Sequence, residues 1–214
     1  EAYSQDIVVN DLYLLLKHLG IEQAHIGGLS MGGNATLNFG IAHPEMARSL
    51  IVAAAGSGSS NRENFLASSK IFTDRLLAEG IEVPGTEYAH GNTRVQLLRK
   101  DPQGYAEFLR LFLAHNNVSA ALTFREYVMA RPTVYALEEK LRALQVPTLI
   151  MIGDEDEPCV DPAVFMKRTI PRSGLVVFPQ SGHAINLEEP DLFNRAVMDF
   201  LTAVEADRWV ERPA

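Results

Sequence analysis

The segment HIGGLSMGG, residues 25–33, has the pattern of a short strand that turns sharply into a helix. The small residues after Ser30 continue as a helix until Pro44 stops it. Residues 28–32 have the form G-x-S-x-G, which in this setting pushes the serine hydroxyl out above the carboxyl edge of a sheet. We therefore predict that Ser30 is a nucleophile and that the backbone N–H of Met31 helps to bind an oxyanion.

The sequence on either side predicts alternating strands and helices. A first helix is predicted behind the cap residue Ser4 and ends at Gly20, with an apolar face at Val8, Leu12, Leu15 and Leu16. Further strands are predicted at residues 49–54, 148–152 and 175–178, and a helix at residues 162–170 behind Asp161. The last helix begins near Pro190, with an apolar face at Phe193, Val197, Leu201 and Val204. This order predicts an α/β protein with a mostly parallel sheet and helices on both faces.

The middle of the chain lacks strand alternation. Its first residues are rich in serine and asparagine, and several helical stretches with many aromatic residues follow. We interpret residues 56–144 as an inserted helical cap, and residues 1–55 and 145–214 as a partial α/β core.

A serine nucleophile requires a histidine base and an acid that orients it. Five of the six histidines lie at predicted helix ends, at a strand start or in the cap: His18, His25, His43, His90 and His115. His183 instead follows the last predicted strand, on the loop edge where Ser30 also lies, and is the predicted general base. The acidic run of residues 154–157 follows the preceding strand, and the residues alone do not choose among its four carboxylates.

Three blocks of the sequence resemble the α/β-hydrolase family: residues 28–33, residues 147–156, and residues 181–183 with Glu188-Glu189-Pro190 behind them. Their order of serine, acid and histidine also fits. The resemblance implies that Asp156, the third residue after Gly153, is the acid, with Asp154 as the alternative. It also implies that about four strands and a helix precede the segment that corresponds to residues 1–20, and that one of their loops donates a second oxyanion N–H.

Nothing like those preceding strands is present, so the predicted oxyanion hole is half built. The strand at residues 25–29 would then be an unpaired sheet edge, which invites self-association. We expect the 214-residue chain to be a fragment that, expressed alone, is poorly soluble or self-associated and nearly inactive.

Composition excludes several classes of function. An apolar share of 47% and a charged share of 21% are those of a globular protein. A net charge of -8 without a basic cluster argues against a nucleic-acid partner, and no apolar run is long enough to span a membrane. The one cysteine, Cys159, excludes an internal disulfide and favours a reducing, cytoplasmic setting.

These features predict a serine hydrolase that cleaves a carboxylic ester or lactone with a small to medium apolar acyl group, through an acyl-enzyme. No metal or cofactor is expected. Substrate-binding candidates are Leu29, Phe112 and Phe124. The alternatives are a C–C bond hydrolase or a cofactor-free perhydrolase on the same three residues, or a non-catalytic small-molecule receptor with the hydrolase fold.

Overall fold

A computed structural model describes residues 3–211. Its sheet has four parallel strands in the order β1-β2-β3-β4, with bounds Ala24–Leu29, Ala47–Ala53, Thr148–Gly153 and Ser173–Phe178. The register sets Leu29 beside Ala53 and Gly153 beside Phe178. Four carboxyl ends therefore lie at one edge, and the segments that follow β1, β3 and β4 meet there.

The side chains of each central strand alternate between two hydrophobic cores. Ile150 and Ile152 of β3 pack into the larger core, whereas Leu149 and Met151 pack into the smaller one. This alternation follows from the two-residue repeat of a strand. All six residues of β3 are buried, as expected for a strand covered on both faces.

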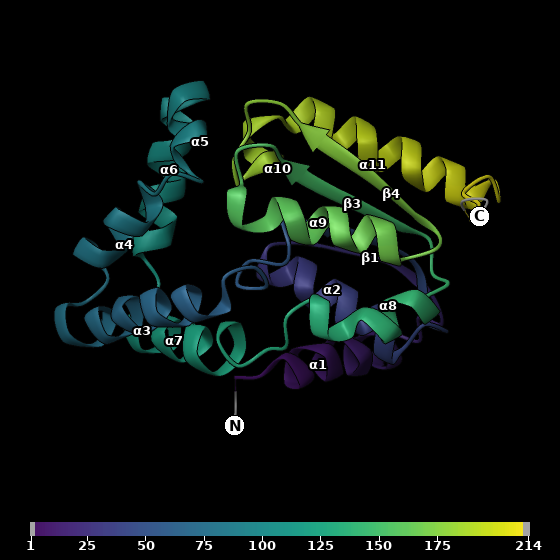
Figure 1. Cartoon of the computed structure of the whole chain (residues 1–214), viewed down its shortest axis with the longest axis horizontal. Coiled ribbons are helices and arrows are strands. Elements are labelled where there is room, and N and C mark those ends of the chain that lie inside the picture. Colours follow the sequence, from purple (N-terminus) through teal and green to yellow (C-terminus); the bar gives the residue numbers. More distant parts are fainter. Residues whose placement is uncertain (1–2, 212–214) are drawn as a thin grey trace.

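Helices cover both faces, so the predicted fold class is confirmed (Figure 1). One face carries α1 (Gln5–His18), α2 (Met31–Ala42), α8 (Glu138–Ala143) and α9 (Glu157–Thr169). The other face carries α10 (Ile185–Glu188) and α11 (Pro190–Glu205). The four residues of the predicted apolar face of α11 pack against the smaller core, as expected. The most deeply buried residue of this helix is Phe200, which lies beside that face.

The predicted apolar face of α1 is wrong at two of its four residues, Val8 and Leu15. Ser4 caps the helix by accepting the N–H of Ile7, but Val8 and Leu15 are exposed. Leu16 is buried and Leu12 packs against the larger core, as predicted. Val9 is buried in place of Val8. The helix carries apolar residues on more than one side, so its periodicity does not determine which side faces α2.

Helix α9 begins five residues before the prediction and contains Pro162. The predicted start behind Asp161 is therefore wrong. A proline within a helix removes one hydrogen bond and crowds the preceding turn. Pro162 is the sixth residue of α9, beyond the first four N–H groups that lack an acceptor within a helix, so α9 loses one backbone hydrogen bond at this position.

The middle segment consists of helices that lie on the side toward which the arrowheads of β3 and β4 point (Figure 1). They are α3 (Arg62–Glu79), α4 (Glu82–Ala89), α5 (Val95–Lys100), α6 (Pro102–Leu113), α7 (Asn117–Leu122) and the π-helical turn η1 (Thr123–Val128). The short turn η2 (Tyr135–Leu137) and α8 instead contribute Leu137 and Leu141 to the larger sheet core. We therefore propose that the cap ends near residue 133, not at residue 144.

Strand β1 pairs with β2 on one side and with no other strand among residues 3–211. Its carbonyl and N–H groups on the open side have no ladder partner there. Self-association of the 214-residue chain stays a prediction, which light scattering on the purified chain would check.

Candidate active site

Ser30 lies at the turn between β1 and α2 with φ 58° and ψ -112°. Non-glycine residues rarely adopt a positive φ, so the surrounding bonds must hold the turn. The N–H of Ser30 donates to the carbonyl of Ala53 (2.8 Å), and the carbonyl of Ser30 accepts the backbone N–H (3.0 Å) and the side-chain amide (2.9 Å) of Asn34. Asn34 is buried, so it holds the strained turn from within the core.

The glycines around Ser30 have unequal roles. A Cβ on Gly28 would collide with the backbone of Gly32, so this glycine is required for the strand and helix to approach. A Cβ on Gly33 would lie 2.8 Å from the carbonyl oxygen of Ala53. A Cβ on Gly32 would have no neighbour within 4 Å. The close approach therefore depends on Gly28 and Gly33.

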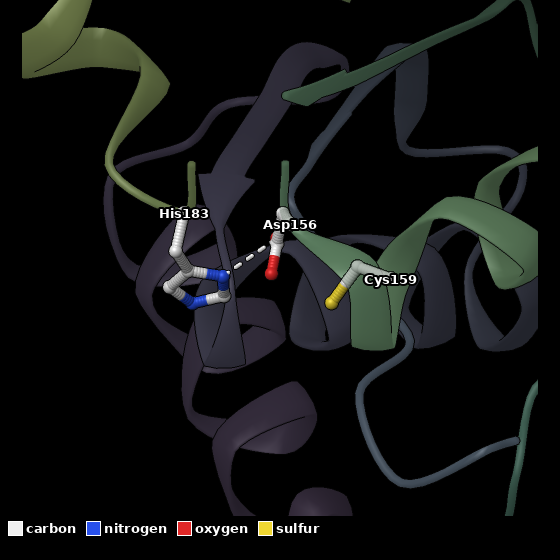
Figure 2. Close-up of side chains that lie close together, drawn as sticks. All are labelled: Asp156, Cys159 and His183. Atoms are coloured by element: carbon white, nitrogen blue, oxygen red, sulfur yellow. Dashed lines mark hydrogen bonds and ion pairs between the residues drawn. The ribbon is translucent and has the colours of Figure 1, made fainter. Parts of the chain in front are cut away.

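The structure brings Ser30, His183 and Asp156 together. The Nε2 atom of His183 lies 2.7 Å from the Oγ atom of Ser30, and the Nδ1 atom lies 2.7 Å from the Oδ2 atom of Asp156. Figure 2 shows the imidazole of His183 facing the carboxylate of Asp156. Both side chains are buried, so water competes little for these hydrogen bonds.

The partners of His183 set the direction of both hydrogen bonds. An ionised carboxylate only accepts, so Nδ1–H of His183 donates to Asp156. In the neutral imidazole Nε2 is then the acceptor, and the Ser30 hydroxyl donates to it. This is the arrangement in which the histidine can take the serine proton.

The backbone N–H of Met31 is placed to bind a developing oxyanion. Met31 is the first residue of α2, so its N–H has no acceptor within the helix. The positive end of the helix dipole lies at the same point. The hydroxyl of Tyr127 donates to the carbonyl of Met31 (3.1 Å) and ties this turn to the cap.

The other carboxylates of the acidic loop point elsewhere. Asp154 is exposed, and its Oδ1 atom accepts the backbone N–H of Ser181 (3.1 Å). The Oε2 atom of Glu155 accepts from Gln96 and Arg99, both at 2.8 Å. The geometry thus favours Asp156 over Asp154 as the partner of His183.

The loop that carries His183 is held by a buried carboxylate that the residue pattern alone did not single out. The carboxylate of Glu188 accepts the N–H of Gly182 (2.6 Å) and the N–H of Ala184 (2.9 Å), on either side of His183. Burial raises the pKa of Glu188, and the two N–H donors oppose this shift. Glu188 is therefore a candidate positioning residue.

Replacing Glu188 with glutamine is expected to lower kcat by about 10-fold or more, with a smaller effect on KM. A glutamine offers one oxygen, so one of the two loop N–H groups would face a donor. The nearby Asp191→Asn variant is the control, since Asp191 is exposed and makes no ion pair among the described residues. Steady-state kinetics checks this prediction, and equal kcat values for the two variants would contradict it.

Cap residues 93–100 also bind the two loops that carry His183 and Asp156. The carbonyl of Thr93 accepts the N–H of His183 (2.7 Å), and Lys100 donates to the side chains of Ser181 and Glu189. Gln96 and Arg99 hold Glu155, the neighbour of Asp156. This part of the cap therefore positions the loops of His183 and Asp156 as well as covering them.

Ser30, Met31, Asp156 and His183 line a cavity of about 790 Å³ between the sheet edge and the cap. Four aromatic side chains on its wall contact one another in pairs, with ring centroids 5.0 to 5.9 Å apart: Phe72, Tyr88, Phe112 and Phe124. The predicted residues Phe112 and Phe124 are thus on the cavity wall. Leu29 is not among the lining residues, because it packs against both hydrophobic cores.

Asp156, Cys159 and His183 have potential metal-ligand atoms within 4.8 Å of one another (Figure 2). Burial raises the pKa of the Cys159 thiol well above its ordinary value, so the thiolate that a metal requires is disfavoured. Both nitrogens of His183 already bond to Ser30 and Asp156. These donors do not fit a metal site.

A match to the family described as alpha/beta hydrolase fold covers residues 1–190. The chain therefore belongs to the α/β-hydrolase fold family, as the resemblance of its three sequence blocks predicted. Within residues 3–211, no helix combines the length and the apolar character needed to cross a membrane.

Named proteins are similar to this chain in sequence or in structure. The "2-hydroxy-6-oxononadienedioate/2-hydroxy-6-oxononatrienedioate hydrolase 2" of Pseudomonas putida is 28% identical, over 92% of this chain and 68% of its own length. The "uncharacterized carboxylesterase nap" of Bacillus subtilis is also 28% identical, over 91% of this chain and 62% of its own length. The structure of MenH from S. aureus matches with a TM-score of 0.85 and 23% identity, over 94% of this chain and 76% of that one.

Proposed function

We propose that this protein is a serine hydrolase that cleaves a carboxylic ester or lactone through an acyl-enzyme. The observation that carries the proposal is the hydrogen-bonded series from Ser30 through His183 to Asp156 at the wall of the cavity. A serine hydroxyl gains nucleophilicity only when an adjacent base can take its proton. Relatives named as a hydrolase and a carboxylesterase are consistent with this function.

In the proposed mechanism, the Oγ atom of Ser30 forms a bond to the substrate carbonyl carbon while its proton passes to Nε2 of His183. Asp156 stabilises the imidazolium, and the N–H of Met31 donates to the oxyanion. Collapse of the tetrahedral intermediate breaks the ester C–O bond, and the leaving alcohol takes the proton from His183. Water then attacks the acyl-enzyme while His183 takes one of its protons. Collapse of the second tetrahedral intermediate breaks the bond to Oγ of Ser30, which regains the proton from His183 as the carboxylic acid leaves.

The proposed substrate has an apolar body of small to medium size. Aromatic and aliphatic side chains form much of the cavity wall, and such walls favour apolar groups and exclude water. A volume of about 790 Å³ lies in the usual range of small-molecule sites.

The test is turnover of p-nitrophenyl esters of graded acyl length by the purified protein and by Ser30→Ala. Turnover that peaks at short to medium chains and is lost in Ser30→Ala supports the proposal. Binding of these esters without any turnover would instead favour the receptor alternative.

We expect Phe112→Ala and Phe124→Ala to change the preference between acyl groups more than the rate of the chemical step. Both rings lie on the cavity wall and pack against Tyr88, and neither belongs to the hydrogen-bonded series. The ratio of kcat/KM for long and short esters measures the effect. An equal loss for every ester would show that these rings only stabilise the cap.

A further inference from the structure

Two of the three arginines on the cavity wall lack a carboxylate partner. Arg75 forms ion pairs with Glu79 and Glu87. No carboxylate of residues 3–211 makes an ion pair with Arg94 or Arg131. The cavity therefore presents two positive charges that the protein itself does not neutralise.

Arg131 is the more deeply buried of the two, with 5% of its surface exposed. Its Nη2 atom donates to the carbonyl (3.0 Å) and the hydroxyl (3.2 Å) of Ser57, which are neutral acceptors. Its Nε and Nη1 groups make no hydrogen bond with the residues that the structure describes. Burial lowers the pKa of Arg131, but an arginine stays protonated in proteins. A buried guanidinium with free donors is an incomplete site, because an unpaired buried charge is costly.

Arg131 lies close to the nucleophile turn. Its backbone N–H donates to the backbone carbonyl of Tyr127, one helical turn earlier. The side-chain hydroxyl of Tyr127 in turn donates to the carbonyl of Met31. Its partner Ser57 lies on the cavity wall together with Ser30. Arg131 and Ser30 therefore line the same cavity.

Arg94 approaches the cavity from the cap. Its guanidinium lies 4.1 Å from the centre of the Tyr88 ring and donates to the Tyr88 and Thr93 hydroxyls. These contacts orient the group without neutralising its charge.

The two acids on the wall are already paired. Glu87 binds Arg75, and Asp156 binds His183. Three arginines and two acids line the cavity, so with its histidines neutral its wall carries a net charge of +1, within a chain whose net charge is -8. A reversal of sign at one site raises the local concentration of anions and repels cations.

Given the serine-hydrolase function proposed above, on which this inference rests, we propose that the substrate carries a carboxylate that Arg131 binds, with Arg94 as a second positive group. The substrate class is an ester with an apolar acyl chain that ends in a carboxylate. A planar guanidinium with two free donors matches a carboxylate in a two-point contact. The aromatic wall then accommodates the chain between the ester and its charged end.

The test compares mono-p-nitrophenyl adipate with p-nitrophenyl hexanoate, which differ in a terminal carboxylate. The wild-type protein should have a higher kcat/KM for the adipate. Arg131→Met should lower the ratio of adipate to hexanoate kcat/KM by about 10- to 100-fold, and Arg131→Lys should lower it less. Arg110→Met, which removes an exposed charge that does not line the cavity, should keep the wild-type ratio.

Arg94→Met serves as a second variant, since Arg131→Met also removes bonds to Ser57 and could fail to fold. It should lower the same ratio by a smaller factor, and circular dichroism checks the fold of each variant. The carboxylate site would be overturned if the wild-type protein showed no preference for the adipate. It would also be overturned if Arg94→Met and a folded Arg131→Met both kept the wild-type ratio.

A binding experiment separates this inference from the proposed function. Isothermal titration of Ser30→Ala with adipate tests the charged site without any catalysis. Adipate binding that Arg131→Met abolishes supports the site even in a protein that turns over neither ester, and that pattern would contradict only the hydrolase function. Ester turnover without adipate binding would contradict only the carboxylate site.

Discussion

Replacing His183 with alanine or Asp156 with asparagine is expected to lower kcat by about 10⁴-fold or more, with the fold intact. His183→Ala removes the base that lies 2.7 Å from the Ser30 hydroxyl. Asp156→Asn removes the negative charge that stabilises the imidazolium and favours the wrong tautomer of His183. Steady-state ester hydrolysis measures both effects, and circular dichroism checks the fold.

Asp154→Asn is the matched control for Asp156→Asn. Asp154 is two residues away and accepts a single backbone N–H, from Ser181. Its asparagine keeps an oxygen that can accept the same bond. If Asp154→Asn lost more kcat than Asp156→Asn, Asp156 would not be the acid that orients His183.

Gly28→Ala is expected to abolish most of the activity, with a loss of about 10²-fold or more in kcat and of about 1–3 kcal/mol in the free energy of unfolding. The added methyl group would collide with the backbone of Gly32, which cannot rotate away. The strand and helix would separate and carry Ser30 away from His183. Denaturant unfolding and ester kinetics measure the two losses.

Gly32→Ala tests the same motif with the opposite expected result. Its methyl group would have no neighbour within 4 Å, so both stability and kcat should stay close to those of the wild-type protein. Similar losses of stability and kcat in Gly28→Ala and Gly32→Ala would contradict the packing described for this turn.

Local pattern was sufficient to predict the strand, turn and helix around Ser30 and the parallel sheet. Glycine spacing and continuous apolar runs depend on contacts within a few residues, and these are visible in the sequence. The phase of α1 was not predictable in this way, because its apolar residues surround the helix and only the packing of α2 decides which are buried.

The choice of Asp156 needed the family resemblance. Four consecutive carboxylates are equivalent in sequence, and the direction in which each one points depends on how the loop turns after β3. Arg131 and Glu188 were also beyond local pattern. Their importance comes from burial beside segments that are distant in the chain, as the bonds of Arg131 to Ser57 illustrate.

The central claim is that Ser30 is the nucleophile, and covalent capture by a fluorophosphonate tests it most directly. The probe reacts only with a serine whose hydroxyl is activated by a base. Intact-mass analysis should show a single adduct, peptide mapping should place it on Ser30, and Ser30→Ala should remain unlabelled. An adduct on another serine, with Ser30 left unmodified, would contradict the account.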